Sequence, residues 1–184
     1  MSDPTVGATE LRTGLVLVLE DALPALAAAR RELAPELCAR GIPLHLTILY
    51  PFAPAAEVDA ALPRLDAVLG RHAPLAVELT AVETWPGAVF ADAAPSPRLR
   101  ALLDDVLAAF PEHPPYGGEH DEVHPHVTLA VPTEGDEAAV AARARALLGD
   151  ALPCTARVDG VALVEELEPA RWRVREVRPL GAAA

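Results

Sequence analysis

Two short apolar runs in the sequence each carry a histidine followed, two residues later, by a threonine. His45 precedes Thr47 in the first run, and His126 precedes Thr128 in the second. Both runs predict β-strands, where residues i and i+2 lie on the same face, so each imidazole would stand beside a hydroxyl. A single pair of this kind is common in protein cores. Two pairs in 184 residues favour a shared chemical role.

Two imidazoles across a cleft form an acid–base pair that works near neutral pH, because the ordinary pKa of histidine is about 6.5. A neutral imidazole takes a proton from an attacking hydroxyl or water, and a protonated one gives a proton to the leaving oxygen. The two hydroxyls suit the non-bridging oxygens of a phosphate. The residue types therefore predict phosphodiester transfer at a cyclic phosphate, provided that the fold brings the pairs together.

The composition limits the partners. The formal net charge is −12, and all of the basic residues apart from histidine are arginines. So acidic a chain is unsuited to duplex DNA, because non-specific binding requires many phosphates to be neutralised. A small phosphate-bearing ligand needs only a few donors inside a cleft and stays compatible with this charge.

The two cysteines, Cys38 and Cys154, are too few for a disulfide framework, and residues 1–4 begin the chain with polar character. Charges or prolines interrupt every apolar run well before the ~20 residues that span a bilayer. We therefore expect a cytoplasmic protein with no membrane contact, and a monomer.

The hydrophobic pattern predicts alternating helices and strands. Helices are expected at 21–40, capped by Asp21 and kinked or divided by Pro35, and at 57–71, 97–110 and 137–148. Gly41 is expected to end the first helix. Beyond the two histidine strands, strands are expected at 14–20, 75–84, 88–91, 155–166 and 172–178. Pro63 predicts a kink in the second helix or a later start.

One order of elements occurs twice: a helix, a histidine strand, another helix and a hairpin. The first copy covers about 22–91 and the second about 97–178, and the histidines are 126 − 45 = 81 residues apart. This repetition predicts a single domain, 1–184, of two intertwined lobes related by an approximate two-fold axis. Such an axis can place both histidine strands beside one cleft.

The paired segments resemble the signature of the two-histidine phosphoesterase superfamily, which includes 2′-5′ RNA ligases and cyclic phosphodiesterases. The longer phrases 44–52 and 114–118 are similar to a bacterial branch of 2′-5′ RNA ligase family proteins. In element order the similarity covers about 14–178. It implies an α+β fold in which duplicated antiparallel sheets flank a central cleft, with helices outside.

The resemblance also implies the function. It assigns His45 and His126 as the acid–base pair and Thr47 and Thr128 as phosphate binders. The expected reaction is the opening of a 2′,3′-cyclic phosphate, or the making and breaking of a 2′-5′ linkage, with no metal or other cofactor. The net charge favours a nucleotide or an RNA terminus over a long RNA. The sequence does not define which histidine is the acid.

Two other functions stay open. The segment 119–126 is rich in histidine and carboxylates, so His120, His124 and His126 are candidate metal ligands, although no common metallohydrolase spacing is present. Alternatively, the same fold could hold a nucleotide without turnover. For His124, a solvated loop position is favoured over one at the mouth of the cleft.

Aromatic residues near the two motifs are candidates for substrate binding. Tyr116 and Phe52 could each stack on a base, with core packing the alternative for both. Tyr50 has the opposite parity to His45 and is expected to face away. Trp85 could lie at the rim or in the core, and Trp172 is expected to pack under the last hairpin. A solvated strand face is expected for Arg171, Arg173, Arg175 and Arg178, and each of these side chains is also a candidate to reach a phosphate.

Overall fold

A computed structural model describes residues 11–118 and 123–181. Its strands are β1 (Thr13–Val18), β2 (His45–Leu49), β3 (Leu75–Trp85), β4 (Ala88–Ala93), β5 (His126–Ala130), β6 (Cys154–Val158), β7 (Gly160–Glu168) and β8 (Arg171–Pro179). Its helices are α1 (Pro24–Leu33), α2 (Pro35–Ala39), α3 (Val58–Leu69), α4 (Pro97–Ala109) and α5 (Glu137–Leu148), with short 3-10 turns η1 (Pro115–Gly118) and η2 (Gly149–Ala151). None of the described helices has the length and hydrophobicity needed to cross a membrane.

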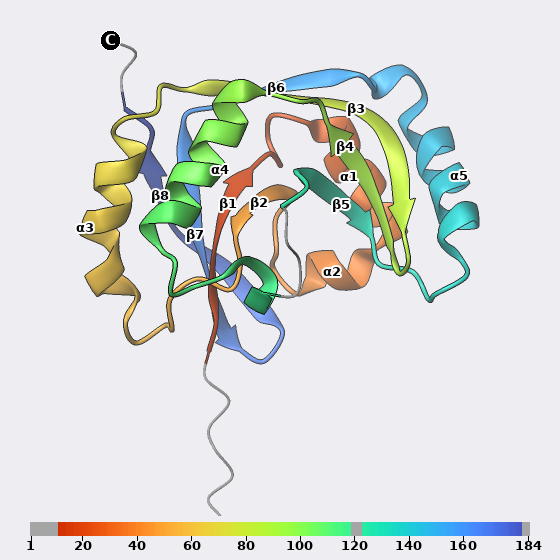
Figure 1. Ribbon diagram of the computed structural model, residues 1–184. Helices are drawn as coiled ribbons and strands as arrows, with labels where there is room; N and C mark the ends of the chain where they lie inside the picture. The colour runs from red at the N-terminus through yellow and green to blue at the C-terminus, as the bar shows by residue number, and fades with distance from the viewer. Residues whose placement is uncertain (1–10, 119–122, 182–184) are drawn as a thin grey trace, which may run out of the picture.

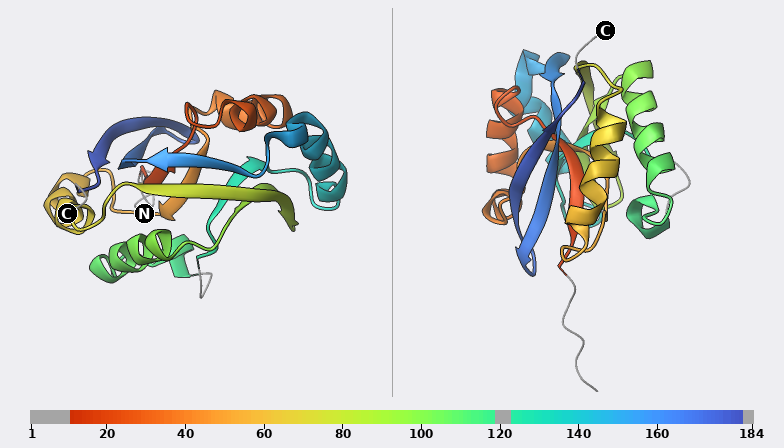
Figure 2. Two further views of the ribbon diagram at one scale, coloured as in Figure 1. Left: turned by 90° about the horizontal axis from the view of Figure 1, so that it is seen from above. Right: turned by 90° about the vertical axis from the view of Figure 1, so that its left-hand side faces the viewer.

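The strands form one antiparallel sheet in the order β6-β3-β4-β5-β2-β1-β7-β8. The sheet is curled (Figures 1 and 2), and the two histidine strands, β2 and β5, lie side by side at its centre. They are joined by one register match, between Leu46 and Val127. The predicted α+β fold class is confirmed, with the expected sheets present as the two halves of one sheet.

Each half of the sheet is covered by a pair of helices. Helices α1 and α5 pack together and contact β5, β3 and β4, whereas α3 and α4 pack together and contact β8 and β2 (Figure 2). Each half also takes strands from both expected repeats, since β2 lies in one half with β7 and β8, and β3 and β4 lie in the other half with β5 and β6. The boundaries 22–91 and 97–178 of those repeats stay a prediction.

The first helical region differs from its prediction. Helix α1 begins at Pro24 after Leu23, not at Asp21, and α2 begins at Pro35. Proline is favoured in the first turn of a helix, where its missing N–H is not needed, so both prolines mark helix starts. Pro35 therefore divides the helix, which was one of the two expected outcomes. Helix α3 runs from Val58 through Pro63, so the later start is wrong.

The last hairpin is also organised differently. Residues 155–166 were expected to form one strand, but Asp159 separates β6 from β7. Strand β6 pairs with β3 at one edge of the sheet, whereas β7 pairs with β1 and β8 near the other. This region therefore connects the two halves of the sheet. The apolar pattern alone could not show the break, because both strands contain buried residues.

Candidate active site

The central strands separate apolar from polar side chains. Leu46 of β2 and Val127 of β5 are fully buried in the main core. His45, Thr47 and their β5 counterparts alternate with these core residues and are partly exposed. The alternation follows from the strand geometry, so the four polar side chains share the face opposite the core.

The register brings the two pairs together. Because Leu46 lies opposite Val127 in an antiparallel pair, the residues before and after this match face each other crosswise. His45 is thus aligned with Thr128, and Thr47 with His126. Two imidazoles and two hydroxyls therefore lie on adjacent strands in a nearly symmetric arrangement.

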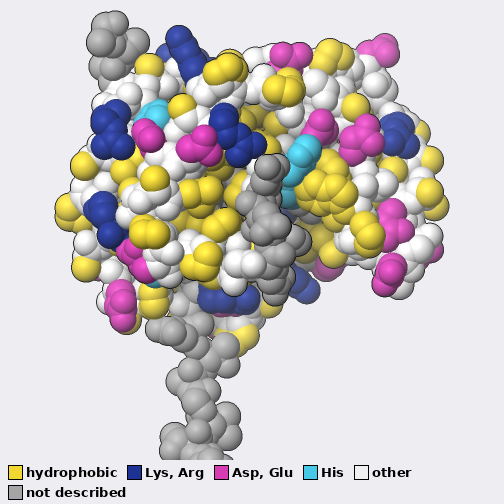
Figure 3. All heavy atoms as spheres, viewed as in Figure 1, with side chains coloured by type: hydrophobic (Ala, Val, Ile, Leu, Met, Phe, Trp, Pro, Cys, Tyr) yellow, Lys and Arg dark blue, Asp and Glu magenta, His cyan; other side chains and the backbone are white. Residues whose placement is uncertain are grey.

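The two imidazoles are held in the same way. His45 Nδ1 lies 2.7 Å from the Pro43 carbonyl, and His126 Nδ1 lies 2.8 Å from the His124 carbonyl. A carbonyl can only accept, so Nδ1 carries the proton in each neutral ring and Nε2 keeps its lone pair. Neither Nε2 has a hydrogen-bond partner within the described ranges. Figure 3 shows histidine side chains beside hydrophobic ones near the middle of one face.

His45 is surrounded by features that favour its neutral form. Burial lowers its pKa to about 4, although the hydrogen bond to Pro43 raises it in part. The charges of Arg30 and His126 lower the pKa further. Arg30 is itself buried in α1, 3% exposed, and donates from Nη1 to the Ile42 carbonyl at 2.8 Å. A buried cation thus lies behind His45.

His126 has different neighbours. Burial lowers its pKa and the hydrogen bond to the His124 carbonyl raises it, while the charge of His124 lowers it and that of Asp92 raises it. Asp92 lies opposite His126 in the β4–β5 register and accepts a 2.6 Å contact from His124 Nε2. His124 is exposed, in agreement with the favoured loop position. An anion therefore accompanies this imidazole.

Tyr116 lies against the first pair. Its backbone N–H donates to the Tyr50 carbonyl at 2.6 Å, and its hydroxyl shares a side-chain hydrogen bond with Thr47. Burial raises the pKa of the Tyr116 hydroxyl, and the Thr47 bond acts in the opposite direction. Tyr116 has φ +52° in η1, a left-handed conformation uncommon outside glycine. Such an outlier is typical of positions held for a function.

Phe52 belongs to the core. Its side chain is 3% exposed and packs edge-on against Phe110 and His113, at centroid distances of 5.0 and 5.7 Å. The ring is therefore not accessible for stacking on a base. Of the two roles that the sequence left open, packing is the one that its surroundings support.

Tyr50 does not lie on the face of β2 that strand alternation predicts for it. Strand β2 carries a bulge: successive residues of β1 face Leu49 and Thr47, which leaves Ile48 as an extra residue. A bulge reverses the alternation beyond it, so Tyr50 falls on the same face as His45 and Thr47. With these two residues it lines an open cavity of about 320 Å³. The expectation that Tyr50 faces away is wrong.

Trp172, expected under the hairpin, lines the same cavity and lies 5.9 Å from the Tyr50 ring. Arg12 and Arg40 line it too, and neither was predicted from the sequence. Arg12 comes just before β1, and Arg40 follows α2. No local motif marks either residue, because they meet only through the pairing of β1, β2 and β7 and the docking of the last hairpin.

Trp85 lies at the rim on the other side of the site. It is 39% exposed, and its ring lies 4.1 Å from that of Phe90 and 4.7 Å from that of His126. The sequence left rim and core positions open for this residue. Its exposed ring supplies an aromatic surface beside the second histidine.

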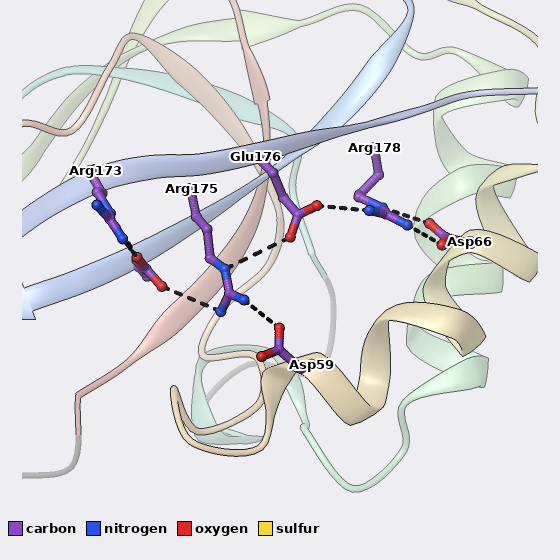
Figure 4. A network of polar contacts seen from close by, with 7 residues as sticks. Asp59, Asp66, Arg173, Arg175, Glu176 and Arg178 are labelled. Atoms are coloured by element: carbon purple, nitrogen blue, oxygen red, sulfur yellow. Dashed lines mark hydrogen bonds and ion pairs between the residues drawn. The ribbon is translucent and has the colours of Figure 1, made fainter.

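The arginines of β8 are paired away from the histidines. Figure 4 shows Arg173, Arg175 and Arg178 in a chain of contacts with acidic residues of β7, β8 and α3. The pairs are Arg173–Glu165, Arg175–Asp59, Arg175–Glu165, Arg175–Glu176, Arg178–Glu176 and Arg178–Asp66, and Arg171 pairs with Glu168. These partners support the expected charged strand face.

Within residues 11–118 and 123–181, no group of three or more histidine, cysteine or acidic side chains could hold a metal ion. His120, one of the three candidate ligands, lies outside the described residues. His124 and His126 are engaged with Asp92 and with the backbone, as given above.

Solved structures of other proteins share this fold. The protein TT0787 of Thermus thermophilus aligns with 94% of this chain and 100% of its own, at 24% identity and a TM-score of 0.63. E. coli LigT complexed with 3′-AMP aligns with 94% of this chain and 99% of its own, at 16% identity and a TM-score of 0.59. At these identities, the comparisons establish the fold alone.

The sequence itself establishes the family. The model of the 2′-5′ RNA ligase superfamily matches residues 18–170, so the chain belongs to that superfamily. The resemblance carried by the two histidine motifs is thereby confirmed. No curated protein matches the chain. Family membership supports a phosphoesterase-type function without defining the reaction or its direction.

Proposed function

We propose that this protein is an enzyme that opens 2′,3′-cyclic phosphates, or makes and breaks 2′-5′ phosphodiester linkages, on nucleotides or RNA termini without a metal. One observation carries the proposal: the β2–β5 register aligns His45 with Thr128 and Thr47 with His126. Each imidazole has its Nδ1 anchored on a carbonyl, which leaves Nε2 for proton transfer. A phosphate placed across the strands meets one acid–base group and one hydroxyl from each strand.

The surroundings of the two histidines support a different role for each of them. His45, desolvated and backed by the buried Arg30, stays neutral and takes the proton of the attacking water. His126, accompanied by Asp92, carries the proton that the leaving oxygen receives. Water then forms a new bond to phosphorus as the bond to the 2′ or 3′ oxygen breaks. The step leaves the proton on His45, and solvent exchange restores both groups.

Thr47 and Thr128 bind the non-bridging oxygens in this account. Donors fixed in advance toward developing negative charge stabilise the transition state more than the ground state. Tyr116 orients the Thr47 hydroxyl through their shared hydrogen bond. The site thus contains the groups that the reaction needs within the protein itself.

The comparisons support a small nucleotide as substrate. E. coli LigT has been crystallised with 3′-AMP, ATP and NADP⁺. The net charge of −12 agrees with a short ligand, because long RNA would require an extended basic surface. A nucleotide-binding module without turnover is the second candidate. Two imidazoles with matching anchors argue against it, since binding alone needs no acid–base pair.

The test is turnover in excess chelator. We expect the protein to open 2′,3′-cyclic nucleotides, or the cyclic phosphate of ADP-ribose, in EDTA, and the His45→Ala and His126→Ala variants to lose this activity while staying folded. Tight nucleotide binding with no product would contradict the enzyme and favour the binding module. Activity that returns only with added Zn²⁺ or Mn²⁺ would favour the metal site that includes His124.

A further inference from the structure

The cavity of about 320 Å³ beside the first histidine pair has no role in the proton transfers above. His45 and Thr47 form one of its walls, and Tyr50 and Trp172 form an aromatic corner, with ring centroids 5.9 Å apart and planes at 62°. Val16 and Val164 belong to a small apolar cluster, separate from the main core, that also lines it. The cavity is therefore apolar and aromatic where it adjoins the proposed phosphate position.

Two glycines make this aromatic corner possible. A Cβ on Gly14 would meet Tyr50 Cδ2 at 3.2 Å and Val164 Cγ2 at 3.4 Å, so the absence of a side chain leaves room for the Tyr50 ring. Gly41 has φ +81°, and a Cβ there would lie 2.2 Å from the Trp172 carbonyl oxygen. The last hairpin can therefore approach the end of α2, where Trp172 N–H donates to the Arg40 carbonyl at 2.7 Å.

The two arginines of the cavity differ in their availability. Arg12 is held by Glu166, with Nε and Nη2 each 3.1 Å from a carboxylate oxygen. Its guanidinium also lies over the rings of Tyr50 and Trp172, at 5.9 and 5.8 Å. Arg40 is exposed, and within the described part of the chain its guanidinium makes no hydrogen bond or ion pair. One cation thus supports the aromatic rings, and the other is available to an anion.

A second cavity, of about 330 Å³, serves as a comparison. It lies near His124 and is lined by Ala93, Ser96, Arg100 and neighbouring residues. It has no tyrosine or tryptophan wall, and Arg100 donates to the Val123 carbonyl at 3.2 Å. Of these two cavities, only the one beside His45 combines aromatic surface with an available guanidinium.

We propose that the Tyr50–Trp172 cavity binds one nucleotide unit of the substrate, with its base against the aromatic corner and a phosphate other than the reacting one on Arg40. Aromatic side chains stack on bases of any sequence, and a guanidinium binds phosphate in a bidentate manner. The volume lies at the lower end of small-molecule sites, which span roughly 300–1,000 Å³. It suits one unit.

This inference rests on the proposed function, because the cavity is placed relative to a phosphate between the histidines. It narrows the substrate class. The preferred substrate carries a second phosphate, as an RNA terminus or a nucleoside bisphosphate does, and a cyclic mononucleotide is a minimal substrate. Recognition of one neighbouring unit also agrees with the acidic surface, since one additional phosphate needs only one further cation.

Fluorescence of Trp172 provides a direct test that needs no turnover. The chain has two tryptophans, so in a Trp85→Phe background Trp172 is the only reporter. We expect adenosine 3′,5′-bisphosphate to quench it and to bind roughly tenfold tighter than 3′-AMP, whereas ribose 5-phosphate gives no quenching. Equal quenching by ribose 5-phosphate, or equal affinity for the two adenosine nucleotides, would overturn the proposal.

Variants of the two binding groups complete the test. Arg40→Gln should abolish the preference for the bisphosphate, and Arg178→Gln, whose side chain is paired with Asp66 and Glu176, is the matched control that keeps it. By calorimetry, Trp172→Ala should weaken binding of both adenosine nucleotides roughly tenfold. Unchanged affinities in both Arg40→Gln and Trp172→Ala would exclude this cavity as the site. Absence of turnover with these binding effects intact would contradict the proposed reaction alone.

Discussion

The two halves of the site share a backbone arrangement and differ in electrostatic surroundings. Each half presents a histidine and a threonine from a central strand, with Nδ1 bonded to the carbonyl two residues earlier. Behind His45 lies the buried cation Arg30, whereas the anion Asp92 accompanies His126. In the proposed reaction, the near-symmetric geometry would position one phosphate, and the difference in charge would separate a base from an acid.

The aromatic surroundings differ as well. On the His45 side, Tyr50 and Trp172 line a cavity, and on the His126 side Trp85 lies at an exposed rim. The first arrangement forms a cavity and the second forms an open surface. A substrate would therefore be bound more tightly on one side of the reacting phosphate than on the other.

The largest effect is expected from the histidines themselves. His45→Ala and His126→Ala should each lower kcat by roughly 10²–10⁴-fold, because each removes one partner of the proton transfer. Steady-state assays of both variants on a 2′,3′-cyclic nucleotide, with circular dichroism as a folding control, measure this. Full activity of either variant would show that its half is not needed.

The next largest effect on kcat is expected from the threonines. Thr47→Val and Thr128→Val preserve shape and remove one hydroxyl each, so kcat should fall roughly 10²-fold with a smaller change in KM. Tyr116→Phe should lower kcat by less than Thr47→Val, because the Tyr116 hydroxyl acts through Thr47. A Tyr116→Phe defect as large as that of Thr47→Val would instead place the phenol on the substrate.

The pH dependence of kcat/KM tests the difference in charge between the surroundings of His45 and those of His126. The pKa of His45 is lowered to about 4, and that of His126 is lowered below its ordinary value of about 6.5, so kcat/KM should rise above about pH 4 and fall again before pH 6.5 as His126 loses its proton. Arg30→Met should raise the pKa of His45 and move the acidic limb up by roughly half to one pH unit. Asp92→Asn should lower the pKa of His126 and move the basic limb down.

The neighbouring Arg31, which is exposed and paired with Glu20, supplies the control. Arg31→Met should leave both limbs where they are. Movement of both limbs in the same direction in the Arg30 and Asp92 variants would contradict the assignment of base and acid.

Stability should also depend on pH through His45. Its folded pKa lies below the ordinary value of about 6.5, so between about pH 4 and 6.5 the unfolded chain binds more protons than the folded one. The free energy of unfolding should therefore rise with pH across this window, by roughly 1–3 kcal/mol. Urea unfolding of the parent and of His45→Gln measures it, and an equal slope in both would show that another group is responsible.

The smallest effect on stability and activity is expected from a substitution in β8. Arg178→Gln removes ion pairs with Asp66 and Glu176 at a largely solvated surface, so it should cost about 1 kcal/mol or less and leave kcat unchanged. A large loss of activity would place β8 in phosphate binding after all. Thermal unfolding together with the cyclic nucleotide assay decides between these outcomes.

The features that sequence predicts well here are local. The alternation of leucine and valine with His45, Thr47, His126 and Thr128 was sufficient for the two central strands and for the face that they share. Nothing local could show that the β2–β5 register aligns the two pairs crosswise, since this depends on which strands meet.

The predictions that were wrong also depend on features that no local sequence pattern shows. Counting parity from His45 fails at Tyr50 because a bulge at Ile48 shifts the alternation, and β-bulges have no reliable sequence mark. Arg12 and Trp172 are far apart in sequence and meet only because the last hairpin docks beside β1. The aromatic cavity could therefore be found only from the tertiary structure.

The proposed reaction requires both imidazoles to act on one phosphorus atom. A crystal structure of the protein with inorganic phosphate tests it most directly. We expect one phosphate between β2 and β5, with each Nε2 within ~2.6–3.2 Å of one of its oxygens and the two Nε2 atoms roughly 5–8 Å apart. A phosphate bound to one histidine alone, with the other Nε2 beyond hydrogen-bonding reach, would contradict it.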